Sequence, residues 1–328
     1  MFDADLSLVP AHQRILVAAS GGADSMALIV WLLSEQRNVV VGHVNHALDE
    51  LRGGACARDE AWLRLRCDEL GVPLQSETIV LERRDGHVNE AVARTGRYAA
   101  LQRLALANDC ALVATAHTAS DALEGLILNI GRGAGLRGQS SFASSRPLGD
   151  GLTLVRPLWR VGRQQVRDWL LSQNQTWLED ESNLSELFRR NRVRAEVVPL
   201  LSSIFGREAD SLARSFALNA QLSRDEDSFL EREAQRTLEM LIVKRGEKLL
   251  ALNGIALRDL DVALARRVLR LAARSVQPEL REIERLKIET VRLAAVNGQK
   301  REVWTWRNGV RVEWTGAGSG NRFRFWCV

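Results

Sequence analysis

The chain begins with a strand, a glycine turn and a helix in direct succession. An apolar run at residues 15–19 precedes Ser-Gly-Gly-Ala-Asp-Ser at residues 20–25, and a second apolar run follows at residues 26–33. Such a turn points several backbone N–H groups at a ligand from a helix N-terminus, where the helix dipole favours an anion. The missing Cβ atoms of glycine allow that anion to approach closely. The succession therefore predicts a phosphate-binding loop, with a nucleoside triphosphate as its ligand.

The same stretch differs from two common nucleotide-binding loops. It lacks the lysine of G-x-x-x-x-G-K-[ST] and the spacing of G-x-G-x-x-G. A tight turn at Gly21 and Gly22, with Ser25 as an ordinary helix cap, would be a structural alternative. We favour a phosphate loop because the six residues resemble the S-G-G-x-D-S pyrophosphate loop of ATP pyrophosphatases that adenylate a carbonyl oxygen. That resemblance implies AMP and pyrophosphate as products.

Short apolar strands alternate with helical patterns through the first half of the chain. We predict strands at residues 14–19, 38–44, 73–80 and 111–115, and helices at residues 25–35, 56–70, 89–107 and 121–130. This order is typical of an α/β fold with a parallel sheet. Ligands bind at the carboxyl ends of the strands in such sheets, so the polar residues after these ends are expected in one cleft. Residues 137–153, rich in Gly, Ser and Pro, are predicted to be a long mobile loop over the site.

The second part of the chain has a different pattern. A length of 328 residues suggests two domains, which we place at residues 1–206 and 207–328. A stripe of apolar residues at helical spacing is predicted to be buried: Leu212, Phe216, Leu222, Phe229, Leu230, Leu238 and Leu241. Three β-like runs follow, at residues 303–306, 310–314 and 323–326. Asn308-Gly309 between the first two is a strong hairpin signal, so we expect a mainly helical domain that ends in a small β element.

Tryptophans and arginines are interleaved near the C-terminus. The tryptophans are Trp304, Trp306, Trp314 and Trp326, and the arginines are Arg301, Arg307, Arg311, Arg322 and Arg324. Such aromatic side chains can stack on RNA bases. They can equally fill a small β core while the arginines stay in solvent, and we favour this second interpretation.

The amino-acid composition indicates which kinds of binding partner and which cellular compartment suit this chain. The pI of 9.1 and the net charge of +4, with 45 Lys and Arg that are mostly Arg, fit a polyanionic partner. The four cysteines form no C-x-x-C pair, which disfavours disulfides, zinc fingers and cysteine-held iron–sulfur clusters and suits a reducing cytosol. No apolar stretch reaches about 18 residues and the acidic N-terminus is unlike a signal peptide. We therefore expect a cytoplasmic protein with no membrane partner.

Several further motifs are explained together by one family. In chain order they are His43-Val44-Asn45-His46, Asn89 to Arg94 leading into Arg97-Tyr98, Ala114 to His117, Arg132-Gly133-Ala134-Gly135, Arg156-Pro157-Leu158, Asp180-Glu181-Ser182-Asn183 and Arg190 to Arg194. In this order and spacing they resemble the tRNA(Ile)-lysidine synthase family, continuously over about the first 200 residues. The second domain resembles the tRNA-binding extension of that family only loosely.

The resemblance implies a fold, a reaction and partners. The fold is an adenine nucleotide alpha-hydrolase-like catalytic domain with a PP-loop, followed by a tRNA-binding domain. In this family ATP activates the C2 oxygen of the wobble cytidine in tRNA(Ile) with a CAU anticodon, and L-lysine then displaces AMP. The product, lysidine, lets the tRNA read AUA and be charged with isoleucine. ATP and Mg²⁺ are the implied cofactors.

The candidates for catalysis are Asp24, His117, Asp121 and Arg194. Asp24 is the hard oxygen ligand nearest the phosphate loop and suits a Mg²⁺ ion that neutralises the leaving pyrophosphate. A neutral imidazole at His117, just after a strand end, can hold phosphate or base edges or move protons. Asp121 and Glu124 share one helix face, where paired carboxylates can orient the cationic head of lysine. Arg194 suits tRNA phosphates or the developing charge of the adenylate.

The remaining assignments concern binding. We expect ATP to be held by Ser20, Gly21, Gly22, Ala23, Asp24, Ser25 and His46. Contacts with tRNA or lysine are assigned to Glu124, Arg132, Arg190, Asn191 and Arg192. Each group also has a structural interpretation, because acids at helix starts are often caps and clustered arginines are often solvated.

This chain departs from the family pattern at defined positions. After the strand predicted at residues 111–115, many members of the family have A-H-H-x-D-D-Q-x-E-T. His117, Asp121 and Glu124 match this pattern. The differing residues are Thr118, Ser120, Ala122 and Gly125, and Ala47-Leu48 replaces a usual Gly-Leu-Arg. We expect the reaction to survive these changes, although Ala122 and Gly125 remove polar groups that could touch the nucleotide or the amine.

Two alternatives to lysidine synthesis stay open in the sequence. A paralogue that joins a different amine to the same cytidine would tolerate the changes at residues 118–125. A tRNA-binding relative without catalysis would differ by losing its phosphate loop, which this chain retains. Sulfur-inserting and amidotransferase relatives are disfavoured because their cysteine motifs or glutaminase domain are not visible. The apolar stripe at residues 212–241 leaves room for a homodimer.

Overall fold

The computed structural model describes residues 2–46, 55–80, 83–84, 87–88, 90–139, 142–179, 189–280, 283–297, 300–316 and 321–327. The chain divides into two compact units, Met1–Arg224 and Asp225–Val328. The longest helix, α10 (Ala209–Leu241), contributes residues to both units. Among the described residues, no helix combines the length and apolar character needed to cross a membrane.

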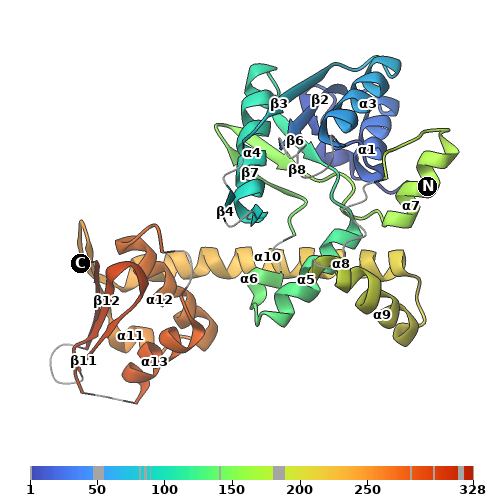
Figure 1. Cartoon of the computed structure of the whole chain (residues 1–328). Helices are drawn as coiled ribbons and strands as arrows, with labels where there is room; N and C mark the ends of the chain where they lie inside the picture. Colours follow the sequence, from blue (N-terminus) through green and yellow to red (C-terminus); the bar gives the residue numbers. More distant parts are fainter. Residues whose placement is uncertain are drawn as a thin grey trace. The chain divides into compact units, whose positions relative to one another are not determined.

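The first unit is built on a six-stranded sheet with the strand order β3-β2-β1-β6-β8-β7 (Figure 1). Its strands are β1 (Arg14–Ala18), β2 (Asn38–Asn45), β3 (Leu74–Thr78), β6 (Leu112–Thr115), β7 (Ser145–Gly149) and β8 (Leu152–Val155). All neighbours pair in parallel except the edge strand β7, which is antiparallel to β8. The predicted parallel α/β fold is therefore confirmed.

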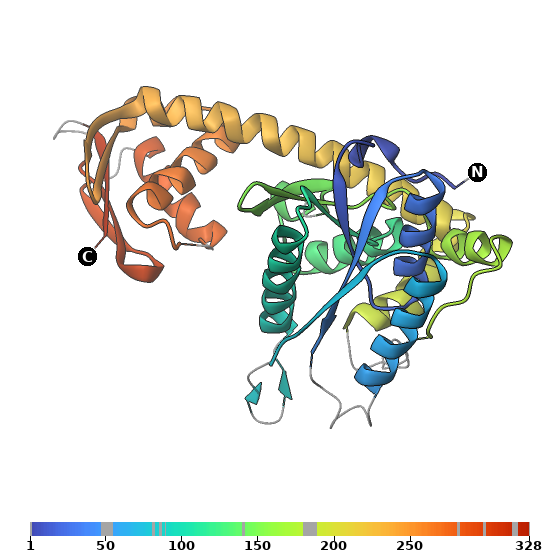
Figure 2. The same ribbon diagram turned by 90° about the horizontal axis from the view of Figure 1, so that it is seen from above.

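Helices cover both faces of this sheet, as Figure 2 shows. On one face lie α1 (Ala23–Ser34), α3 (Ala55–Glu69) and α7 (Arg163–Ser172), and on the other lies α4 (Glu90–Ala107). Helix α5 (Ala119–Gly131) packs instead with the start of α10, and α6 (Leu136–Gln139) packs against α5. Alternate residues of β1 serve the two faces: Ile15 and Val17 pack with α1, α3 and α7, whereas Leu16 packs with α4. This period of two places the apolar side chains of β1 alternately in two cores.

Shorter elements complete the first unit. A two-stranded ribbon is formed by β4 (Arg83–Arg84) and β5 (His87–Val88). A helical stretch runs from α8 (Arg189–Arg192) through a π-helical turn (Val193–Val197) into α9 (Val198–Phe205). A π-helical turn of this kind is often found at a functional site.

The predicted loop at residues 137–153 is wrong, because this segment contains α6 and most of the hairpin β7–β8. Asp150 and Gly151 turn the hairpin with positive φ values of 48° and 77°. Asp-Gly is a favoured pair for such a turn. Pro147 lies within β7, which is tolerated because β7 is an edge strand. The hairpin signal was present in the sequence, and the surrounding Gly, Ser and Pro residues concealed it.

The second unit combines helices with a five-stranded antiparallel sheet in the order β11-β12-β13-β10-β9. The strands are β9 (Ile242–Gly246), β10 (Leu249–Asn253), β11 (Glu302–Thr305), β12 (Val310–Trp314) and β13 (Arg322–Cys327). The helices, besides the end of α10, are α11 (Gly254–Arg258), α12 (Val262–Val276) and α13 (Arg285–Val296). The three predicted β runs are confirmed, and Asn308 turns the hairpin between β11 and β12 with φ 56°. Sequence patterns missed β9 and β10.

The core of the second unit decides between the two interpretations of its tryptophans. Trp306 and Trp314 are buried beside Phe323 and Phe325, and Trp304 packs against the same cluster. The core interpretation is therefore confirmed for these aromatic side chains. Arg301 and Arg324 both pair with the buried carboxylate of Glu313 from the solvent side.

The predicted stripe along α10 is buried only at its two ends. Leu212 packs in the first unit, and Leu238 and Leu241 pack in the second. Leu222 and Phe229, between them, are 62% and 55% exposed. The prediction of one continuous buried stripe was therefore wrong, because the helix serves two separate cores.

Candidate nucleotide-binding site

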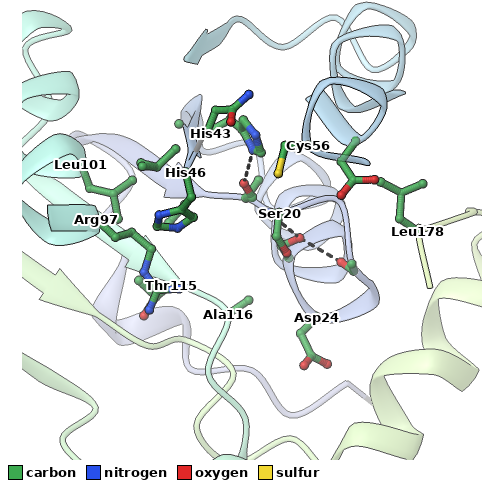
Figure 3. Close-up of a pocket in the computed structure, with 18 of the residues that line it drawn as sticks. Ser20, Asp24, His43, His46, Cys56, Arg97, Leu101, Thr115, Ala116 and Leu178 are labelled. Carbon is green, nitrogen blue, oxygen red and sulfur yellow. Dashed lines mark hydrogen bonds between the residues drawn. The ribbon is translucent and has the colours of Figure 1, made fainter. Parts of the chain in front are cut away.

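A pocket of about 780 Å³ opens at the carboxyl ends of three strands (Figure 3). Its walls include Ser20 after β1, His46 after β2 and His117 after β6. The sequence predicted one cleft at these strand ends, and the geometry confirms it.

The loop at residues 20–25 joins β1 to α1 in a conformation that needs glycine. Gly21 has φ 87°, a left-handed value that side chains disfavour. A Cβ atom on Gly21 would also lie 2.8 Å from Cδ1 of Leu178. Ser25 braces the loop, because its Oγ donates to the Gly22 carbonyl at 2.9 Å and accepts from the Ser20 N–H at 3.4 Å. The loop thus presents a helix N-terminus to the pocket.

A distant segment of the chain holds this loop in place. The Leu178 N–H donates to the Gly21 carbonyl at 2.9 Å, and Gly22 and Leu178 form a parallel β-bridge. Leu178 and Glu179 also line the pocket. Sequence patterns carried no signal for this contact, because Leu178 belongs to neither a strand run nor a recognisable motif.

Asp24 lies in the first turn of α1, facing the pocket. Burial and the nearby charge of Asp121 raise the pKa of Asp24 to about 6, although Arg163 opposes this shift. Among the described residues, its Oδ1 atom is buried without a hydrogen-bond partner. A hard oxygen that is buried and unpartnered fits a Mg²⁺ ion, which coordinates carboxylate and phosphate oxygens.

Asp121 caps helix α5 with one oxygen and binds cations with the other. Oδ2 accepts from the N–H and hydroxyl of Thr118 at 2.7 and 3.0 Å. Oδ1 lies 2.8 Å from Arg190 and 3.6 Å from Arg163. Burial raises the pKa of Asp121, but His117 and these two guanidinium groups outweigh burial and leave the pKa below its usual value. Asp121 is therefore ionised at neutral pH.

His117 follows β6 and stands between this carboxylate and the strand. Its Nδ1 atom lies 3.0 Å from the hydroxyl oxygen of Thr115. Burial lowers the pKa of His117 from 6.5 to about 3, against the opposing effect of Asp121. The imidazole is therefore neutral at physiological pH, with one ring nitrogen that donates and one that accepts a hydrogen bond.

Glu124 is only 1% exposed and binds three guanidinium groups. Its oxygens lie 2.7 Å from Arg190 Nε, 2.8 Å from Arg194 Nε and 3.2 Å from Arg163 Nη1. A buried carboxylate is stable only when it is paired in this way. Glu124 thus orients arginines in this structure, and its predicted contact with an amine stays a prediction.

Arg163 is a residue of this site that sequence reasoning missed. At the first position of α7, its side chain contacts Glu124 and Asp121 and reaches 4.0 Å from Asp24. It therefore joins the carboxylate of the phosphate loop to both carboxylates of α5. An isolated arginine after Gly162 has no local signature, because only the tertiary fold brings the three acids around it.

The structure brings most of the predicted residues together. Those that line the pocket are Ser20, Gly22, Asp24, Ser25, His46, His117 and Asp121. Arg190, Arg194 and Glu124 form the adjoining ion-pair cluster, joined to the pocket through Asp121.

The other predicted residues lie elsewhere. Arg132, Asn191 and Arg192 do not line the pocket; Arg132 is exposed at the end of α5, and Arg192 pairs with Glu196 at 2.8 Å. Ala47-Leu48, Asn89 and Asp180 to Asn183 lie outside the described residues. The roles assigned to all of these residues stay predictions.

Comparisons with known proteins agree with this geometry. A family model described as a PP-loop domain matches residues 4–201. A tRNA(Ile)-lysidine synthase of Geobacter sulfurreducens is 33% identical over 290 residues, which are 86% of this chain and 59% of that protein. The chain thus spans less than two thirds of that relative. A tRNA(Ile)-lysidine synthase of Nostoc sp. is 32% identical over 306 residues, which are 88% of this chain and 86% of that protein.

A solved structure supports the fold. The U34-tRNA thiolase NcsA from Methanococcus maripaludis, with its [4Fe-4S] cluster, is similar with a TM-score of 0.54 and 16% sequence identity, over 67% of this chain and 75% of that one. This likeness concerns the fold alone. Because the PP-loop model covers more than half of the chain and the Nostoc relative is matched over most of its length, the chain belongs to the tRNA(Ile)-lysidine synthase family of PP-loop proteins.

Proposed function

We propose that this protein uses ATP to join lysine to C2 of the wobble cytidine of tRNA(Ile) with a CAU anticodon, giving lysidine, AMP and pyrophosphate. The carrying observation is a PP-loop pocket in which Asp24, Asp121 and His117 line one cavity, in a chain of the lysidine synthase family. The modified tRNA would read AUA and be charged with isoleucine in the cytoplasm.

The first step is adenylation of the cytidine. The C2 oxygen attacks the α-phosphorus of ATP, the bond to the bridging oxygen breaks, and pyrophosphate leaves with the electron pair. The N–H groups and hydroxyls of residues 20–25 stand ready to hold that pyrophosphate without reorganisation. Mg²⁺, held by Asp24, would neutralise the phosphate charge. The buried, unpartnered Oδ1 atom of Asp24 supports this assignment.

The second step is displacement of AMP by lysine. The amine attacks C2 and loses a proton, while the C2–O bond to the adenylate breaks and AMP leaves. Ionised Asp121 is suited to orient the amine while it loses its proton to water, and neutral His117 is suited to hold the cytidine or a phosphate through a hydrogen bond. The lowered pKa of Asp121 keeps this carboxylate ionised and the lowered pKa of His117 keeps the imidazole uncharged, and both states support these roles.

Arginines beside the pocket are suited to the charge that develops on the adenylate. Arg194 is oriented by Glu124, with 2.8 Å between Nε and the carboxylate oxygen. Such a fixed guanidinium can bind a phosphate with two hydrogen bonds. We assign tRNA binding outside the pocket mainly to the second unit.

The test is pyrophosphate release on mixing the protein with ATP, Mg²⁺ and tRNA(Ile) with a CAU anticodon. We expect release that depends on this tRNA, and absence of release would refute catalysis in favour of a protein that only binds tRNA. Mass spectrometry of the cytidine after reaction with a mixture of amines then identifies the substrate. Lysine incorporation supports the proposal, and incorporation of another amine would make the protein a paralogue of different specificity.

A further inference from the structure

Three guanidinium groups lie over the phenol ring of Tyr98 at the edge of the pocket. The guanidinium carbons of Arg94, Arg97 and Arg146 lie 5.2, 5.7 and 5.0 Å from the ring centroid. Arg156 also acts on the phenol electrostatically. We call these four arginines with Tyr98 the Tyr98 cluster.

The fold assembles this cluster from separate elements. Arg94, Arg97 and Tyr98 lie three and four residues apart on α4, which places them on one helix face. Arg146 comes from the edge strand β7, and Arg156 directly follows β8. An exposed helix face and the edge of the sheet thus meet at one concentration of positive charge.

Three arginines of the cluster, Arg94, Arg146 and Arg156, are not neutralised by the described acidic residues. Among the described residues, Arg94, Arg146 and Arg156 have no carboxylate oxygen within 4.0 Å. Arg94 donates to the Tyr98 hydroxyl at 3.4 Å, and Arg146 donates to the Pro147 carbonyl at 3.0 Å. The arginines around Glu124, in contrast, are all paired with a carboxylate.

Two further observations show that the cluster favours negative charge. Arg156 is buried, and its Nε atom has no hydrogen-bond partner among the described residues. Burial raises the pKa of Tyr98, but the surrounding arginines outweigh burial and lower that pKa below its usual value. The site therefore has a positive potential that neutral protein groups do not satisfy.

The position of the cluster identifies the kind of anion. Arg97 and Tyr98 line the pocket, with Arg97 apart from the Ser20 loop in Figure 3. Arg94 is exposed, and it lies outside the pocket lining together with Arg146. The cluster thus extends from the pocket to the surface, where several guanidinium groups can follow a chain of phosphates.

We propose that the Tyr98 cluster binds backbone phosphates of the tRNA strand that carries the cytidine into the ATP pocket. This inference rests on the proposed function, because it assumes that a tRNA nucleotide enters this pocket. Arginine is suited to the task because its planar guanidinium binds phosphate with two hydrogen bonds. Tyr98 holds the arginines in place by attracting them to its ring face.

The test is a double variant, Arg94→Gln with Arg146→Gln, which leaves the buried Arg156 and the pocket residue Arg97 in place. The matched control is Arg103→Gln on the same helix, where Arg103 is paired with Glu77 at 3.0 Å. Dissociation constants for tRNA(Ile) with a CAU anticodon are measured over a series of NaCl concentrations. The Michaelis constants for ATP and lysine are measured by pyrophosphate release.

We expect the double variant to bind tRNA about tenfold more weakly than the wild type, since charge-assisted hydrogen bonds are lost. The slope of log Kd against log salt should fall by roughly 1.4, since a single-stranded phosphate contact contributes about 0.7. The constants for ATP and lysine should stay within about twofold of wild type, which also shows that the variant is folded. Arg103→Gln should behave as wild type.

Wild-type tRNA affinity and salt slope in the double variant would overturn the inference. It would also be overturned if tRNA binding were unchanged while the constant for ATP or lysine rose, because the cluster would then serve a nucleotide phosphate or the lysine carboxylate. Failure of the proposed function gives a different result, because then the wild type itself releases no pyrophosphate with this tRNA. The single variant Arg94→Gln, at an exposed position, repeats the tRNA measurement with the least disturbance of packing.

Discussion

Arg163 Nε lies 4.0 Å from the Asp24 Oδ2 atom, and the same guanidinium contacts Asp121 and Glu124. One cation thus connects the phosphate loop with the carboxylates of α5. The charge of Asp121 raises the pKa of Asp24, and Arg163 opposes that rise while it also lowers the pKa of Asp121, so this cation favours the ionised form of both carboxylates.

Replacing this cation should impair chemistry more than binding. We expect Arg163→Met to lower the turnover number by at least about tenfold and to leave the Michaelis constant for ATP nearly unchanged, because the loop backbone still holds the phosphates. Pyrophosphate release under saturating tRNA measures both. The control is Arg167→Met on the same helix, which loses only an exposed pair with Glu179; equal effects of the two substitutions would contradict the role of Arg163.

Asp24 should be needed for adenylation and dispensable for tRNA binding. We expect Asp24→Ala to abolish pyrophosphate release because the proposed Mg²⁺ ligand is gone, while the dissociation constant for tRNA stays close to wild type. Filter binding and pyrophosphate assays on the same preparation make the comparison. Lost tRNA affinity with normal ATP turnover would refute this assignment.

The substitution Glu124→Gln tests whether Glu124 mainly orients the three arginines around it or mainly binds the lysine substrate. The substitution leaves three guanidinium groups without their shared buried carboxylate, so we expect a loss of about 3 kcal/mol in the free energy of unfolding. Urea denaturation measures this loss. Glu196→Gln, which breaks only the exposed pair with Arg192, should leave the urea midpoint close to that of the wild type. If Glu124 mainly bound lysine, the Michaelis constant for lysine would rise with little change in unfolding.

His117 should remain neutral to well below pH 6. Burial lowers its pKa, Arg156, Arg97 and Arg190 lower it further, and Asp121 only partly opposes them. The unfolded chain takes up a proton below about pH 6.5, and the folded chain does so only near pH 3, so His117 makes stability fall as pH drops between these values.

The measurement is NMR of the His117 ring, whose carbon-bound proton should keep the chemical shift of the neutral form at pH 5. In parallel, His117→Gln should flatten the decrease of the urea midpoint between pH 7 and pH 5. A ring resonance that titrates near pH 6.5 would show that burial does not control this group.

Truncation should reveal where α10 contributes to the first unit. Leu212, Ala213 and Ala217 pack against Leu123 and Trp159, so a chain ending at residue 206 loses this contact. We expect residues 1–206 to be less stable than residues 1–224 by about 3 kcal/mol from lost apolar burial, read as a lower melting temperature. Equal melting temperatures would mean that the helix adds nothing to this core.

The same truncation tests the assignment of tRNA binding. Residues 1–224 should bind ATP with nearly the affinity of the full chain, while binding tRNA much more weakly, because phosphate contacts spread over basic surface dominate nucleic-acid affinity. Equal tRNA affinity of both chains would contradict the role given to the second unit.

The sequence predicted those parts of the fold that depend on neighbouring residues. The apolar strand β1, the glycine turn before α1 and the Asn308-Gly309 hairpin are local, and each was found where expected. The hairpin at Asp150-Gly151 is equally local, but the Gly, Ser and Pro residues of the segment 137–153 led to the prediction of a loop.

The parts that escaped prediction depend on distant residues. Arg163 and Leu178 reach the site from segments that lie far from the phosphate loop in the sequence. Neither residue has a neighbouring motif that predicts its contacts. The three arginines around Glu124 satisfy a buried charge that sequence patterns identify only as an acid on a helix face. Pairing of this kind is a property of the folded core.

The bridge between Gly22 and Leu178 has a consequence for synthesis on the ribosome. The nucleotide loop is made early, yet the segment that fixes its backbone is made only after all six strands of the sheet. Contacts of such long sequence separation form late, after the intervening chain has folded. A nascent chain that ends before Leu178 therefore lacks the bridge that fixes its nucleotide loop. We expect such a chain to bind ATP only after nearly the whole first unit has left the exit tunnel.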